Sequence, residues 1–118
     1  MGLRFKELRI WQDGMEVTEI IYKITKTFPE SEKFGLANQL QRAAVSIPSN
    51  IAEGSGRNSK KDFAHFLSQA RGSIYEIITQ LEISSRIGMT RTEEIQPLID
   101  KCESLTKQIS ALINSLRT

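Results

Sequence analysis

Apolar residues recur at steps of three and four along most of the chain, which is the spacing of one face of an α-helix. Four segments carry such a stripe: Ile10 to Phe28, Leu36 to Ile51, Phe63 to Leu81 and Ile95 to Leu116. No long stretch alternates with the two-residue period of a β-strand. Four amphipathic helices with short connections predict an all-α fold, an antiparallel up-down four-helix bundle, as one domain over residues 1–118.

Local signals predict where these helices begin and end. Pro29 disfavours a helical residue before it and so ends the first helix. The second helix ends in residues 54–56, Gly-Ser-Gly, because glycine readily adopts the backbone conformation found after a helix. Ser59 is suited to cap the third helix. Thr90 with Glu93 predicts a capping box at the start of the fourth.

Pro48 lies inside the second predicted helix. A proline there removes one backbone hydrogen bond and crowds the carbonyl four residues earlier, which belongs to Ala44. We expect a kink that leaves this carbonyl free for a side chain or water. The alternative is a break into two helices, although the apolar spacing from Leu40 to Ile51 runs through the proline.

Two rows of polar residues accompany the apolar stripes of the second and third helices. At about 100° per residue, each of the following sets occupies one sector: Gln39, Arg42, Ser46, Asn50 and Glu53; and His65, Gln69, Ser73, Glu76 and Gln80. The rows predict a polar network within the bundle or across a subunit boundary, in which Arg42 pairs with Glu53 or Glu76. Two solvated faces, or a ligand site, remain as alternatives.

The first helix carries a second apolar stripe beside its core stripe, formed by Trp11, Met15 and Tyr22. The apolar sector is therefore wider than one bundle face requires. Large aromatic residues and methionine are enriched in protein interfaces. The stripe predicts an oligomer interface, with the alternative that these residues wrap the edge of the monomer core.

The charge balance only weakly constrains the partners of this chain. Sixteen basic and fourteen acidic residues give a net charge of +2, without the strong excess usual in nucleic-acid-binding domains. One local cluster, Arg57, Lys60 and Lys61, precedes and begins the third helix, where backbone amides could add donors for phosphate. These three residues are the predicted nucleic-acid contacts, against the alternative of an ordinary exposed basic loop.

The sequence offers little for catalysis, metal binding or membrane insertion. The single cysteine, Cys102, falls on the core stripe of the fourth helix, and the single histidine, His65, cannot supply a di-iron carboxylate site. No apolar run approaches the ~18 residues needed to cross a bilayer. We expect a cytosolic protein without catalytic, cofactor-binding or metal-binding residues, and hence not an enzyme.

Specific motifs of the chain resemble a known family. They are Phe5-x-x-Leu8-x-x-Trp11-Gln12; Phe28-Pro29, Glu32, Leu36, Gln39, Arg42-Ala43-Ala44, Ser46-Ile47, Asn50-Ile51-Ala52-Glu53-Gly54 and Gly56-Arg57; and Phe63, Phe66-Leu67, Ala70, Gly72-Ser73, Glu76 and Leu81. This pattern resembles the bacterial four helix bundle protein family, whose members are encoded in intervening sequences of large-subunit ribosomal RNA genes. The resemblance spans roughly residues 5 to 116, and the fourth helix adds little to it.

The resemblance implies a homopentameric ring. It also implies kinship with the accessory protein of diversity-generating retroelements, a basic barrel that works with RNA and a reverse transcriptase, from which this chain departs by its net charge of only +2. The leading hypothesis is therefore a non-enzymatic oligomer that binds RNA or an RNA-handling protein. The alternative is a structural or protein-binding scaffold without a nucleic-acid role.

Overall fold

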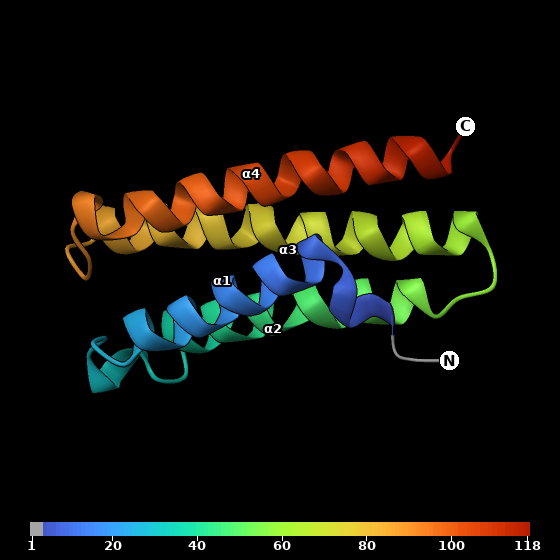
Figure 1. Cartoon of the computed structure of the whole chain (residues 1–118). Coiled ribbons are helices and arrows are strands. Elements are labelled where there is room, and N and C mark those ends of the chain that lie inside the picture. The colour runs from blue at the N-terminus through green and yellow to red at the C-terminus, as the bar shows by residue number, and fades with distance from the viewer. Residues whose placement is uncertain (1–3) are drawn as a thin grey trace.

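The computed structural model describes residues 4–118, which form a bundle of four antiparallel helices (Figure 1). In chain order the elements are η1 (Arg4–Glu7), α1 (Arg9–Thr25), η2 (Glu30–Glu32), α2 (Leu36–Ser55), α3 (Lys60–Arg86) and α4 (Thr92–Leu116), where η denotes a short 3₁₀ turn. The α2–α3 loop, η1 and the end of α4 lie at one end of the bundle, and the other two connections lie at the opposite end. The predicted all-α four-helix bundle is confirmed.

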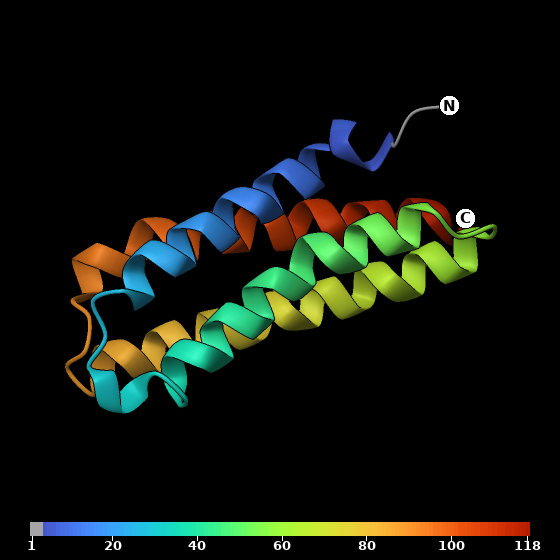
Figure 2. The same ribbon diagram turned by 90° about the horizontal axis from the view of Figure 1, so that it is seen from below.

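The helices are arranged in a square, in chain order. Each long helix packs against the next, and α1 closes the square against α4. Within residues 4–118, the backbones of neither diagonal pair of helices approach each other closely. The α2–α3 pair shares the most extensive contact and runs side by side over most of its length (Figure 2), whereas α1 and α4 share the least.

One apolar core runs along the bundle axis. Its largest fully buried side chains come from all four helices: Ile21, Leu40, Ile47, Ile51, Leu67, Ile74, Ile77, Leu81, Ile95, Leu105, Ile109 and Ile113. At the start of α3, the prediction that Phe63 and Phe66 face the core is only partly right, because both are half-buried while Leu67 is fully buried. Phe63 packs at the edge of the core, and both phenylalanines lie against Gly54, where an added Cβ would lie 2.7 Å from Phe66 Cβ. Glycine thus lets α2 approach α3 closely at this end.

The third helix begins as predicted and the fourth does not. The Ser59 hydroxyl accepts a hydrogen bond from the Asp62 amide at 3.0 Å, which caps α3. At α4 the predicted capping box of Thr90 with Glu93 is wrong. Thr90 is buried and its hydroxyl is hydrogen-bonded to Ser84 at 2.7 Å, so the helix begins after Arg91, whose amide donates to the Glu94 carboxylate at 3.3 Å.

The second helix remains continuous through Pro48, so the alternative of two separate helices is wrong. The Thr18 hydroxyl of α1 lies 3.0 Å from the Ala44 carbonyl, the group that Pro48 deprives of its amide partner, and 2.8 Å from the Gly14 carbonyl. Gly14 lies beside the proline, where an added Cβ would be 3.1 Å from Ile47 Cγ2. The free carbonyl therefore has the side-chain partner that the sequence predicts, whereas the kink itself stays a prediction.

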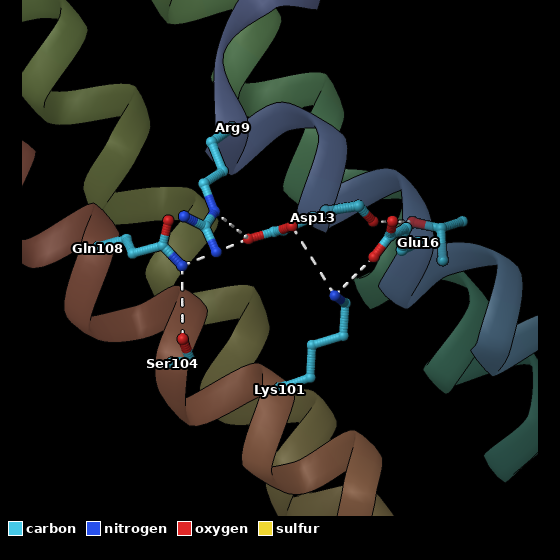
Figure 3. A network of polar contacts seen from close by, with 8 residues as sticks. Arg9, Asp13, Glu16, Lys101, Ser104 and Gln108 are labelled. Carbon is cyan, nitrogen blue, oxygen red and sulfur yellow. Dashed lines mark hydrogen bonds and ion pairs between the residues drawn. The ribbon is translucent and has the colours of Figure 1, made fainter.

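A polar network bridges α1 and α4, the neighbouring long helices with the least extensive contact (Figure 3). Lys101 of α4 lies between two carboxylates of α1, at 2.6 Å from Glu16 and 3.8 Å from Asp13. The Gln108 amide also donates to Asp13, at 3.3 Å. The hydrogen bond to Glu16 raises the pKa of Lys101 above its ordinary value, although partial burial opposes this. Ion pairs and hydrogen bonds thus complement apolar packing in this seam.

Two further features concern the described part of the chain alone. None of its helices combines the length and apolar character needed to span a membrane. Between residues 4 and 118, no three or more histidine, cysteine, aspartate or glutamate side chains gather in a way that could hold a metal ion.

Candidate assembly and nucleic-acid surfaces

An apolar groove of about 380 Å³ lies between α1 and α2 on the outside of the bundle. Its lining residues are Trp11, Met15, Thr18, Val45, Pro48, Ser49 and Ala52, and we call it the α1–α2 groove. Two residues of the second apolar stripe predicted on α1 lie at the surface. Met15 is 39% exposed and Tyr22 is 42% exposed. Tyr22 lies further along the same seam, beside Val45 of α2, which is 43% exposed.

Trp11 differs from the other two residues of this stripe. It is half-buried, packs against the core and makes an edge contact with Phe5, with 5.5 Å between ring centroids. Trp11 therefore wraps the edge of the monomer core, as the alternative interpretation expected. Met15 and Tyr22 instead leave apolar surface exposed.

The residues that α2 contributes to this groove do not belong to the apolar core stripe of that helix. A signal is present in the spacing, because Gln41, Val45, Pro48 and Ala52 follow steps of four, three and four. The stripe on α1 follows similar steps, and such spacing is typical of a face that packs against another helix.

The two polar rows meet across the α2–α3 junction, as one form of the network hypothesis predicts. The Ser46 hydroxyl is hydrogen-bonded to the hydroxyl of Ser73, which is buried. The Gln80 amide donates to the side-chain oxygen of Gln39 at 3.4 Å. Asn50 donates to the Ser46 carbonyl at 2.8 Å, within α2. The centre of the rows is therefore a contact between helices and not two separate solvated faces.

The charged members of the rows do not pair as predicted. Glu53 forms its ion pair with Arg57, one turn later in the chain, at 2.7 Å. No ion pair among residues 4–118 includes Arg42 or Glu76, and both side chains are exposed. Within the chain, the predicted pairing of Arg42 with Glu53 or Glu76 is wrong, because position 57 competes for Glu53 and the open groove separates Arg42 from Glu76. Pairing of Arg42 across a subunit boundary stays a prediction.

The structure separates Arg57 from Lys60 and Lys61, the other two residues of the predicted basic cluster. Arg57 is occupied by the Glu53 carboxylate and stacks over the Phe66 ring, 4.7 Å from its centroid. Lys60 and Lys61 are exposed and line a cavity at the end of the bundle, of about 550 Å³. Arg117, the residue that follows α4, lines the same cavity. No ion pair of the described residues involves these three cations.

Sequence reasoning missed Arg117 because its position beside the α2–α3 loop depends on the antiparallel return of α4. His65 also lines this cavity, and its ring lies 3.1 Å from the Gln69 amide nitrogen. We call Lys60, Lys61, His65 and Arg117 the basic end of the bundle. Its cations could contact phosphate groups.

Cys102, the one candidate nucleophile, lies in the core as predicted. It is fully buried, and burial raises the pKa of its thiol to about 12. Because the thiolate is the reactive form of cysteine, this side chain is inert at neutral pH.

Comparisons with known proteins agree with the fold. A crystal structure of a protein of unknown function from the S23 ribosomal protein family of Bacteroides thetaiotaomicron superposes with a TM-score of 0.82. The two chains are 23% identical, and the match covers 88% of this chain and 97% of the other. A search of curated proteins gives no match. The family model described as 23S rRNA-intervening sequence protein matches residues 6–111. This chain therefore belongs to the 23S rRNA-intervening sequence protein family.

Proposed function

We propose that this chain is a non-enzymatic cytoplasmic protein that assembles with copies of itself, as a pentameric ring, and binds RNA through the basic end of the bundle. The observation that carries the proposal is the exposed apolar α1–α2 groove. The number of subunits is proposed on the family resemblance.

The α1–α2 groove has the properties of an unpaired helix-packing surface. Met15 and Val45 in this groove, and Tyr22 further along the same seam, each leave roughly two-fifths of their surface in water although they belong to two well-packed helices. Both helices present side chains at three- and four-residue steps, the arrangement that receives a further helix. Burying such side chains contributes roughly 25 cal/mol per Å² of apolar surface, which favours association.

The basic end supports the proposal of an RNA partner. Lys60, Lys61 and Arg117 converge from two distant parts of the chain without an ion-pair partner among residues 4–118. A ring repeats this cluster in every subunit, so a modest charge per chain produces a larger local field. Contacts to phosphate from several subunits would add to the affinity, because RNA is a polyanion.

A scaffold without a nucleic-acid role is the second candidate function. The observation that favours it is the ion pair of Arg57 with Glu53. This pairing occupies one of the three predicted nucleic-acid contacts. The net charge of +2 points the same way.

Native mass spectrometry tests both parts of the proposal. The wild type should give a pentamer or a whole-number multiple of it, and nuclease treatment should remove bound mass. Met15→Glu places a carboxylate in the groove, and an unpaired charge buried in an interface costs roughly 3–5 kcal/mol. The affinity between subunits should therefore fall at least ~100-fold.

Phe34→Glu is the matched control, since Phe34 is 85% exposed and outside the α1–α2 groove. The control should keep the assembly intact. A clean pentamer without nuclease-sensitive mass would favour the scaffold. A monomeric wild type, or equal effects of the two variants, would contradict the proposed role of the α1–α2 groove.

A further inference from the structure

The α2–α3 junction is hollowed on its outer side by a polar groove of about 350 Å³. Its lining residues are Gln39, Arg42, Ala43, Ser46, Ser73, Glu76 and Gln80, and we call it the α2–α3 groove. The positive charge of Arg42 stands on the α2 wall and the negative charge of Glu76 on the α3 wall, more than an ion-pair distance apart. Two opposite charges are thus presented outward without neutralising each other.

One lining residue of this groove carries a buried polar atom that lacks a hydrogen-bond partner. Gln80 is only 9% exposed, and its Oε1 is buried with no hydrogen-bond partner among the described residues. Exchanging the two ends of the amide does not remove the problem, because the 3.4 Å bond to Gln39 uses only one of them. A buried polar group without a partner costs about 1–3 kcal/mol.

Apolar surface continues the same edge of α3. Ile83 and Ile87 follow Glu76 and Gln80 after seven residues each, which places them on the same side of the helix. They are 42% and 59% exposed. This edge offers apolar area for association beside charged groups that can set its orientation.

We propose that a second copy of this chain packs its own α2–α3 groove onto this one about a two-fold axis. Each Arg42 then lies against Glu76 of the other copy. A groove with one charge on each wall is complementary to itself when the two-fold axis runs along the groove, because that rotation exchanges the walls. This contact goes beyond the α1–α2 assembly surface, uses different residues and does not rest on it.

The two-fold relation explains why the charges remain unpaired within one chain. Exposed ion pairs contribute little affinity, so the reciprocal pairs select orientation, while apolar burial at Ile83 and Ile87 supplies attraction. If the α1–α2 groove closes a ring, this second contact joins two rings face to face and doubles the mass of the assembly.

Charge exchange tests the pairing. We would measure self-association by sedimentation velocity at low salt in a Met15→Glu background, where the α1–α2 assembly is disabled and pairs alone should form. Arg42→Glu and Glu76→Arg each oppose like charges twice in every contact, and each should weaken pairing by ~10-fold or more. The double variant Arg42→Glu/Glu76→Arg restores two attractive pairs and should bind within ~3-fold of the parent.

These measurements distinguish the two-fold contact from the proposed assembly through the α1–α2 groove. Both side chains are exposed, so circular dichroism should show an unchanged helix content in all variants. Single variants that pair like the parent, or a double variant no better than the singles, would overturn the two-fold contact. A parent that does not pair in the Met15→Glu background would overturn it too, whereas the loss of the ring in that background bears only on the α1–α2 groove.

Cysteine cross-linking tests the symmetry. The variant Arg42→Cys/Glu76→Cys should give covalent dimers and nothing larger on mild oxidation, because a two-fold contact satisfies both cysteines of each chain at once. A ladder of larger species would indicate a head-to-tail contact, and an absence of cross-links would indicate no contact. Either result would overturn the proposal. Cys102 is fully buried and can remain in the protein.

Discussion

Thr18 and Pro48 show how one side chain can compensate for a backbone group that another removes. Proline supplies no amide at position 48, so the buried carbonyl of Ala44 needs a donor from elsewhere. The Thr18 hydroxyl of the neighbouring helix lies 3.0 Å away, and Gly14 allows the two helices to approach at this point. The proline is thus accommodated by residues thirty or more positions earlier in the chain.

The change Thr18→Val tests this compensation. Valine keeps the shape of threonine but cannot donate a hydrogen bond, so the free energy of unfolding should fall by about 1–3 kcal/mol. Thr79→Val is the matched control, because the Thr79 hydroxyl bonds only to the Tyr75 carbonyl of its own helix, on the exposed face. Urea denaturation measures both.

A double-mutant cycle sharpens the test. In a Pro48→Ala background the backbone amide is restored, so Thr18→Val should cost less than it does beside the proline. Equal costs in the two backgrounds would show that the Ala44 carbonyl does not depend on Thr18.

The four helices are not joined equally, and the α1–α4 pair has the least extensive contact of the neighbouring helices. Asp13 and Lys101 both have partly buried side chains, with 18% and 29% exposed. Their contacts, with Glu16 and Gln108, link elements at opposite ends of the chain (Figure 3). Ion pairs of this kind contribute about 0.2–1 kcal/mol each, so they set the position of α1 against α4 more than they stabilise the fold.

The stability contributed by Lys101 should depend on pH. Its hydrogen bond to Glu16 raises the folded-state pKa above the ordinary 10.5, so the folded protein holds this proton more tightly than the unfolded chain. The contribution is complete below pH 10.5 and is lost as the pH rises through the folded-state pKa. Lys101→Met should therefore destabilise the protein at neutral pH and have progressively less effect above pH 10.5.

Urea denaturation at a series of pH values measures this difference. Lys107→Met is the control, because Lys107 is exposed on the same helix and has no ion pair among residues 4–118. A pH-independent difference between wild type and Lys101→Met would show that packing of the lysine stem, and not its charge, makes the contribution.

At the scale of the whole molecule, the antiparallel topology decides where charge gathers. The α2–α3 loop and the last turn of α4 lie at one end of the bundle, which brings Arg117 to Lys60 and Lys61. Arg57 belongs to the same loop but is held by Glu53 and Phe66. The three unpaired cations are thus the better candidates for contacts with phosphate.

Salt-dependent RNA binding tests this assignment. Lys60→Ser/Lys61→Ser/Arg117→Ser should weaken binding of a labelled single-stranded RNA and lower the slope of log affinity against log salt by roughly 2, since each lost phosphate contact accounts for about 0.7. Arg57→Ser should have the smaller effect of the two variants. Fluorescence anisotropy over a range of salt concentrations provides the measurement.

Lys23→Ser/Lys26→Ser/Lys33→Ser removes the same charge from the end of α1 and the α1–α2 connection, away from the basic end. This control should keep most of the salt slope. If both triple variants lose affinity equally, net charge and not the basic end governs the binding.

The helices and their core were accessible from the sequence because their signals are local. The periodicity of Ile21, Ile47, Ile74 and Ile109 required no knowledge of neighbouring helices, and all four are fully buried. The cap at Ser59 was equally accessible, since a hydroxyl and an amide three residues apart suffice. The same reasoning failed at Thr90, because the hydroxyl of this residue is hydrogen-bonded to Ser84 of the preceding helix.

The sequence by itself determined the fold class, the family and the existence of two polar rows and a second apolar stripe, because each is a periodic property of one segment. Only the tertiary structure decided which rows meet and which charges stay unpaired. Glu53 binds Arg57 and leaves Arg42 free, while Arg117 joins Lys60 and Lys61. These outcomes depend on which helices become neighbours, and side chains brought together by folding compete for partners in ways that spacing along one helix does not reveal.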